Sequence, residues 1–85
     1  MKIKFFHQRK YDKNKVLLTH GGATIAYEID DKGLVHKSAA AVCHKKDAYC
    51  KHTGRVKAKG RLLSPRYTII SKPPIPEQDF IKQYI

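Results

Sequence analysis

The sequence predicts an α+β fold: a small three-stranded antiparallel sheet packed by one basic amphipathic helix, with a Pro-linked C-terminal arm. One observation behind this prediction is the alternation of apolar and polar residues over 23–30, which runs into the hairpin sequence Asp30-Asp31-Lys32-Gly33. The hairpin requires a returning strand of similar length, which we expect over 34–43. The other observation is segment 45–64, which is dense in Lys and Arg and places small and apolar residues at helical spacing.

The remaining strand is expected near the N-terminus, over 2–7 or over 15–19. In the first of these segments Ile3 and Phe5 alternate with lysines, as in a strand with one apolar face. The second segment contains a short apolar run that is broken by the glycines at 21 and 22. Both choices stay open at this stage.

In segment 45–64, Asp47 is the candidate N-cap, because its carboxylate can accept from the free N–H groups of a first helical turn. Pro65 disfavours helical geometry at the residue before it, so the helix is expected to end near Ser64. A rotation of about 100° per residue predicts a buried stripe made of Tyr49, Thr53, Val56, Gly60 and Leu63. Gly60 on this stripe would then allow close approach to the sheet, whereas Gly54 falls off it.

The chain is expected to divide into a single small α+β domain, residues 1–71, and a C-terminal arm, residues 72–85. The arm begins with the Pro-rich sequence 72–76, which lacks the N–H groups that a central strand needs. Acidic residues after Pro76 and a cluster of apolar residues near the end predict a short helix. We expect the arm either to fold back onto the core or to reach a partner.

The composition is strongly basic. Of the 85 residues, 18 are Lys or Arg and 7 are Asp or Glu, which gives a formal net charge of +11. This charge predicts a polyanionic partner such as nucleic acid, an anionic membrane or an acidic protein surface, and its alternative use is solubility. No segment is apolar over a bilayer's length and no signal-peptide core follows residue 6, so we expect a cytosolic protein without a membrane partner.

Two dense basic clusters define the candidate nucleic-acid interface, one in the predicted helix and one before residue 16. Lys and Arg neutralise phosphates largely without regard to base sequence, so sequence-tolerant binding to the phosphate backbone is expected. A solvated outer helix face is the alternative interpretation of the same charge. The candidate contact residues are Lys51, Arg55, Lys57, Lys59 and Arg61, with Lys2, Lys4, Arg9 and Lys10.

A group of thiols and imidazoles, Cys43, His44, Cys50 and His52, has the ligand types of a structural zinc site. The spacing, C-H-x5-C-x-H, does not contain the C-x2-C pair typical of such sites, so we expect no metal and no other cofactor. Cys50, surrounded by lysines at the predicted helix start, is also a candidate nucleophile. The sequence supplies neither an oxyanion hole nor an orienting acid for it. We therefore expect a binding protein rather than an enzyme, with both cysteines as reduced thiols.

One sequence pattern resembles a motif of small proteins encoded by phages and prophages. It consists of a Lys-Asp pair with an aromatic residue two positions later (Lys46-Asp47-Ala48-Tyr49), then Gly54-Arg55, and then Ala58 followed by Gly60-Arg61. The resemblance implies a phage-like origin, a location in the host cytosol and a strand that leads into a helix. Together with the small size, it supports a second hypothesis, a host-takeover or anti-defence inhibitor that binds a host protein.

Overall fold

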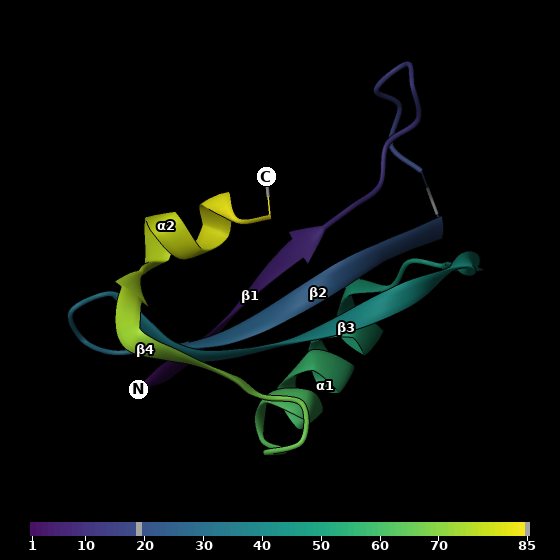
Figure 1. Cartoon of the computed structure of the whole chain (residues 1–85). Coiled ribbons are helices and arrows are strands. Elements are labelled where there is room, and N and C mark those ends of the chain that lie inside the picture. The colour runs from purple at the N-terminus through teal and green to yellow at the C-terminus, as the bar shows by residue number, and fades with distance from the viewer. Residues whose placement is uncertain (19, 85) are drawn as a thin grey trace.

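The computed structural model describes residues 1–18 and 20–84, with the side chain of Lys45 left out of the description. Within this part of the chain, four strands form one antiparallel sheet in the order β1-β2-β3-β4 (Figure 1). The α+β class and the antiparallel sheet are confirmed, with four strands in place of the expected three. The elements are β1 Lys2–Gln8, β2 His20–Ile29, β3 Leu34–Ala48, α1 Lys51–Leu62, β4 Ile69–Pro76 and α2 Glu77–Lys82.

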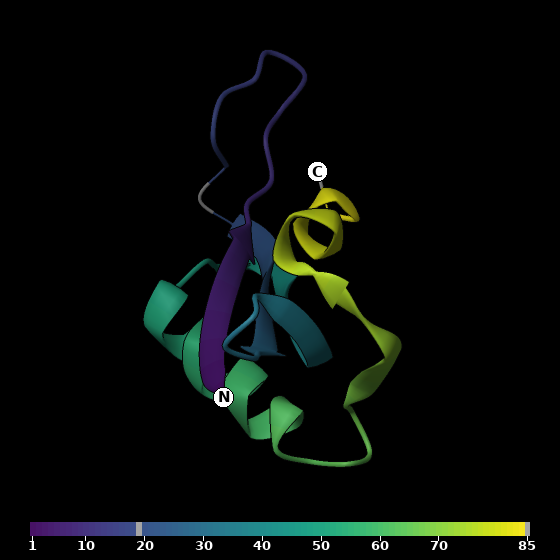
Figure 2. The ribbon, with the colours of Figure 1, turned by 90° about the vertical axis from the view of Figure 1, so that its left-hand side faces the viewer.

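The two helices lie on opposite faces of the sheet (Figure 2). On the α1 face, the sheet contributes small side chains, and Ala58 and Leu62 of the helix pack against them. On the α2 face, Phe80 packs against larger side chains from β2 and β3. The sheet residues of the α1 face are Ala26, Ala39 and Ala41, and those of the α2 face are Ile25, Tyr27 and Val35. Successive residues of β2 point to opposite faces, which separates Ala26 from Ile25 and Tyr27. In β3, the irregular pairing between Val35 and Lys37 places Val35 on the face opposite Ala39 and Ala41.

The hairpin between β2 and β3 forms where the sequence predicts it. The Asp30 Oδ1 atom accepts hydrogen bonds from the N–H groups of Lys32 and Leu34, at 2.8 and 3.0 Å. Gly33 has a φ of 81°, a conformation that glycine adopts without steric cost. The strands are longer than expected, because after an irregular stretch of β3 that follows Cys43 the pairing resumes with His20 opposite Ala48.

The N-terminal strand is β1, in agreement with the choice of 2–7. Of the alternative segment 15–19, residues 15–18 are not part of the sheet, and residue 19 lies outside the described residues. Instead, residues 9–18 form a loop that projects beyond the end of the sheet (Figure 1). Asp12 closes this projecting loop by accepting from the N–H groups of Asn14 and Val16, at 2.8 and 2.9 Å. Leu17 makes only an isolated bridge with Tyr11.

The predicted helix start is wrong. Helix α1 begins at Lys51, after Cys50 in an extended conformation with φ −129° and ψ 115°. Asp47 is not the N-cap, because it lies within β3, in an irregular stretch between the Cys43 and Ala48 pairs with β2, and the helix starts only after Cys50. The C-terminal end agrees better with the sequence, since Leu62 is the last helical residue and Pro65 follows closely.

The predicted buried stripe of α1 is also wrong. Val56 and Leu63 are 59% and 65% exposed, and a Cβ added at Gly60 would meet no described atom within 4 Å. The buried face instead carries Ala58 and Leu62, and Gly54 lies one turn earlier on the same face. Because the sheet contributes alanines on this face, the helix backbone can lie close to it, and Gly54 and Ala58 fit this short distance better than Val56 would.

The C-terminal segment belongs to the packed domain. In β4, Ile75 pairs with Val35, and Pro76 with Leu34, at the edge of the sheet, where prolines are tolerated. Phe80 of α2 is 2% exposed and packs in the core. The Tyr27 hydroxyl donates to Glu77 Oε2 at 2.7 Å, which fixes the first turn of α2. Residues 72–84 therefore fold back onto the sheet rather than forming a linker and a separate arm.

Two glycine substitutions test the register of α1. Gly54→Ala should destabilise the protein by about 1–3 kcal/mol, because the new Cβ would overlap the Thr24 hydroxyl oxygen. Gly60→Ala has open space around it and should stabilise the helix by about 1 kcal/mol. Denaturant unfolding of both variants measures the difference. Equal stabilisation by the two substitutions would show that Gly54 does not face β2.

Truncation of a core residue tests the integration of α2. Phe80→Ala should lower the free energy of unfolding by about 3–5 kcal/mol, because it empties a buried site under the sheet. Ile70→Ala is the control, since Ile70 is 61% exposed on β4 and its truncation should cost little. Thermal melts of both variants give the result. If the Phe80→Ala protein melted at the wild-type temperature, the C-terminal segment would be an independent arm and not part of the core.

Candidate nucleic-acid interface

The first turns of α1 are held against β2 by a close contact between Gly54 and Thr24. A Cβ on residue 54 would overlap the hydroxyl oxygen of Thr24, so only glycine fits at this distance. Thr24 is buried, with 1% of its surface exposed, and cannot move aside without losing its hydrogen bonds. The contact therefore fixes how the start of α1 lies over the sheet.

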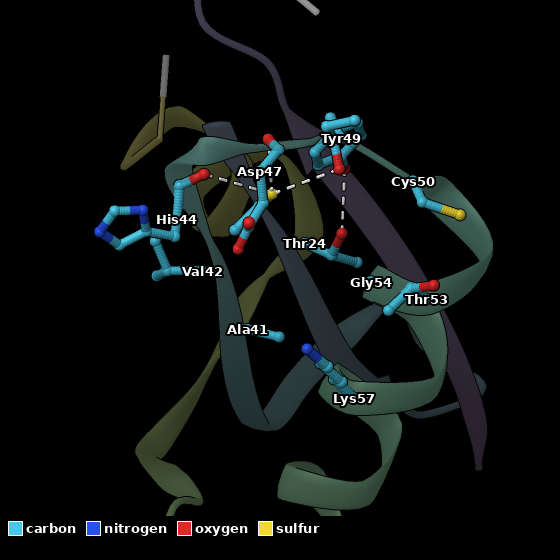
Figure 3. A pocket seen from close by; sticks show the side chains of 12 residues that line it. Thr24, Ala41, Val42, His44, Asp47, Tyr49, Cys50, Thr53, Gly54 and Lys57 are labelled. Carbon is cyan, nitrogen blue, oxygen red and sulfur yellow. Dashed lines mark hydrogen bonds between the residues drawn. The ribbon is translucent and has the colours of Figure 1, made fainter. Parts of the chain in front are cut away.

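A hydrogen-bonded cluster surrounds this contact. The Tyr49 hydroxyl oxygen lies 2.6 Å from His7 Nδ1 and 3.0 Å from the Thr24 hydroxyl oxygen. Thr24 also lies 3.1 Å from His7 Nδ1. The three side chains come from β1, β2 and the β3–α1 connection, so the cluster joins the edge strand, the central strand and the start of the helix (Figure 3 shows Tyr49 and Thr24). We call it the Thr24 cluster.

Positive charge gathers at the Thr24 cluster. The Arg9 guanidinium lies over the Tyr49 ring, with its carbon 4.4 Å from the ring centroid, which is a cation–π geometry. Burial, reinforced by the charges of Lys51, Arg55 and Arg9, lowers the pKa of His7 below its usual 6.5. His7 is therefore neutral at pH 7, and in the tautomer with its proton on Nε2 the Nδ1 atom can accept a hydrogen bond from the Tyr49 hydroxyl.

The cations of α1 divide into two rows. Lys51, Arg55 and Lys59 follow one another at intervals of four residues and so share one side of the helix. Lys51 and Arg55 of this β1-side row lie near enough to His7 for their charges to lower its pKa. Lys57 and Arg61 form a β3-side row, in which the Arg61 Nη1 atom donates to the Ala40 carbonyl at 2.9 Å. The sequence places these cations on one helix, and the structure assigns them to two surfaces.

The N-terminal cations are also distributed over different surfaces. Arg9 joins the β1-side row at the Thr24 cluster. Lys10 lies at the base of the projecting loop, where its carbonyl accepts from the Leu18 N–H at 2.9 Å. Lys2 and Lys4 lie opposite Ile29 and Tyr27, on the face that carries α2, and the Lys4 ammonium pairs with Glu77 Oε2 at 3.1 Å. Of the N-terminal candidate cations, Arg9 therefore lies beside the β1-side row, whereas Lys2 and Lys4 lie on the other face of the sheet.

Cys43 and Cys50 are free thiols. Hydrogen bonds from Thr53 lower the pKa of the exposed Cys50 thiol, with a smaller contribution from Arg55. His36 is engaged at the other end of β3, where its Nε2 lies 2.7 Å from Asp30 Oδ2. Within the described residues, no group of three or more His, Cys, Asp or Glu side chains is placed to hold a metal ion.

Sequence reasoning missed the Thr24 cluster. His7 received no role, and Tyr49 was assigned to the buried stripe of the helix. The contact between them spans 42 positions in the sequence, so it depends on strand pairing that no local pattern encodes. The signal that was present is Gly54, whose place on the helix had no packing reason in the predicted register.

Comparison of the chain with models of protein families, with curated proteins and with solved structures gives no match. Among the described residues, the helices are too short and too polar to cross a membrane.

The His7 titration tests the arrangement of charge at this site. We expect a His7 pKa below 6.5 in the folded protein, and Arg55→Glu should raise it by replacing a repelling charge with an attracting one. Because the folded pKa is lower than the unfolded one, the stabilisation by neutral His7 is complete above pH 6.5 and is lost as the pH falls below it. Nuclear magnetic resonance of the imidazole protons measures the pKa. If Arg55→Glu left the pKa of His7 unchanged, the charges of the β1-side row would not act on His7.

Proposed function

We propose that this protein binds nucleic acid through the phosphate backbone, using Arg9 and the β1-side row of α1 as its main contacts. The observation that carries the proposal is the convergence of Arg9, Lys51 and Arg55 on His7, at one end of the helix. Among the described residues, the ion pairs involve Lys4, His36 and Lys37, so no carboxylate neutralises this group. Unneutralised cations at close spacing bind phosphates and release counterions.

The dimensions of the row suit a phosphate backbone. Lys51 and Lys59 are separated by eight helical residues, which is about 12 Å along the axis. A nucleic-acid strand has one phosphate for every 3.4 Å of duplex axis, so the row can follow several successive phosphates. The Tyr49 ring is already covered by Arg9. The proposed contact is therefore with phosphates rather than with bases, and we expect little sequence preference.

A protein partner is the second candidate function. In this candidate function, the protein is a phage-encoded inhibitor that binds a host protein in the host cytosol. The feature that favours it is the outer edge of β3, which has no strand paired to it beyond Ser38 in the described chain. Both candidates are binding functions, and neither assigns a catalytic step to Cys50.

Binding to labelled DNA duplex at a series of salt concentrations tests the main proposal. Four phosphate contacts predict a slope of about −3.6 for log K against log salt. The double variant Lys51→Glu with Arg55→Glu should flatten the slope by about two contacts and weaken binding more than tenfold. Binding should also raise the pKa of His7, because phosphates neutralise the charges that lower it.

The matched control is the double variant Lys2→Glu with Lys82→Glu. It changes the net charge by the same amount, and Lys2 and Lys82 both belong to the side of the sheet that carries α2. We expect it to keep most of the affinity and the full slope. Equal loss by the two double variants would show that overall charge, not the β1-side row, carries the binding, and no binding at low salt would overturn the proposal.

A further inference from the structure

The outer edge of β3 is open over half of its length. Strand β4 pairs with Leu34, Val35, Lys37 and Ser38, whereas β3 itself continues to Ala48. Beyond Ser38, β3 has no partner on its outer side among the described residues. An unpaired edge presents rows of N–H and C=O groups that another strand can bind.

The direction of these backbone groups follows from the contact with Arg61. The Ala40 carbonyl accepts from Arg61 Nη1 at 2.9 Å, so the backbone groups of Ala40 point outward from the sheet. Residues of an antiparallel strand alternate between inward and outward hydrogen bonding, and Val42 therefore points the same way as Ala40. The open stretch ends at His44, because the Lys46 N–H turns back to donate to His44 Nδ1 at 3.1 Å.

A pocket lies beside this open edge, on the α1 face. It has a volume of about 250 Å³ and is bounded by Ala41 and Cys43 of β3 and by Thr53, Gly54 and Lys57 of α1. Figure 3 shows Lys57 pointing from the helix into the space between α1 and β3. The edge and the pocket together form a groove with a strand on one wall and a helix on the other.

We propose that this groove binds an extended acidic peptide of a partner protein, added as a strand along Ala40 to His44. Backbone groups at strand spacing bind another extended polypeptide, and every second side chain of that peptide would point toward the pocket. A short apolar side chain would fill the pocket between Ala41 and Gly54. The peptide would displace Arg61 from the Ala40 carbonyl and leave its guanidinium free to pair with a carboxylate.

Charge selects the acidic peptide over other occupants. Two cations lie at the groove, Lys57 in the lining of the pocket and Arg61 at the strand edge. The lining residues include one carboxylate, that of Asp47. A second copy of this chain also has a net charge of +11, so electrostatic repulsion disfavours pairing of two β3 edges. Nucleic acid has no alternating amide and carbonyl groups to pair with Ala40 and Val42.

Titration with two model peptides tests the inference. The probes are acetylated, amidated hexapeptides, one alternating Glu with Val and the other alternating Lys with Val. We expect the acidic peptide to slow amide hydrogen exchange at Ala40 and Val42 in a saturable way, and the basic peptide to have no effect. Val42→Pro removes an outward N–H from an edge position and should weaken acidic-peptide binding more than tenfold.

Lys57→Glu covers the case in which Val42→Pro does not fold. It changes an exposed helix residue and should weaken acidic-peptide binding about fivefold or more, whereas Lys82→Glu on α2, with the same charge change, should not. Equal effects of these two variants would overturn the groove as the site. Absence of protection at Ala40 and Val42 would also overturn it. Protection that rises with protein concentration alone would indicate self-pairing and would overturn the acidic peptide as the occupant. Protection caused by an oligonucleotide in place of the peptide would overturn it as well.

Discussion

The contact between Gly54 and Thr24 determines how the rest of the molecule is arranged. It brings the start of α1 so close to β2 that a Cβ on residue 54 would overlap the threonine hydroxyl. Thr24 is held in turn by His7 and Tyr49, which tie in the edge strand and the β3–α1 connection. From this point α1 runs across alanines of the sheet and buries Ala58 and Leu62. Fixing one turn of the helix thus fixes which side chains of every later turn face the core.

The same contact separates the cations of α1 into two surfaces with different chemistry. Rotation of the helix places Lys51 and Arg55 near His7, where no carboxylate among the described residues pairs with them. It places Lys57 and Arg61 beside the open edge of β3, where backbone groups are exposed as well as charge. Charge alone suits a phosphate backbone, and charge combined with an open strand edge suits an extended acidic peptide. Both proposed surfaces therefore follow from the way α1 packs on the sheet.

The sequence was sufficient for the elements that depend on neighbouring residues. The Asp30–Gly33 hairpin and its two strands were predicted because turn chemistry and alternation are local signals. The helix start was not, because Asp47 has the chemistry of an N-cap but precedes Ala48, which still pairs with His20 of β2, so the helix can begin only after it. The buried face of α1 was missed because Gly54 and Ala58 give it only one large apolar side chain, Leu62. For the site, charge identified the cations, but their separation into two rows required knowing which face packs on the alanines of the sheet.

A double-mutant cycle between Thr24 and Tyr49 tests most directly whether the Thr24 cluster holds the start of α1. Thr24→Val keeps the volume and removes the hydroxyl, and Tyr49→Phe removes the other hydroxyl of the 3.0 Å contact. The free energies of unfolding of the two single variants and the double variant give the coupling between the residues. We expect a coupling of about 0.5–1.5 kcal/mol, the net value of a partly buried hydrogen bond. Strictly additive effects would contradict the account, because they would mean that the two hydroxyls do not act on each other.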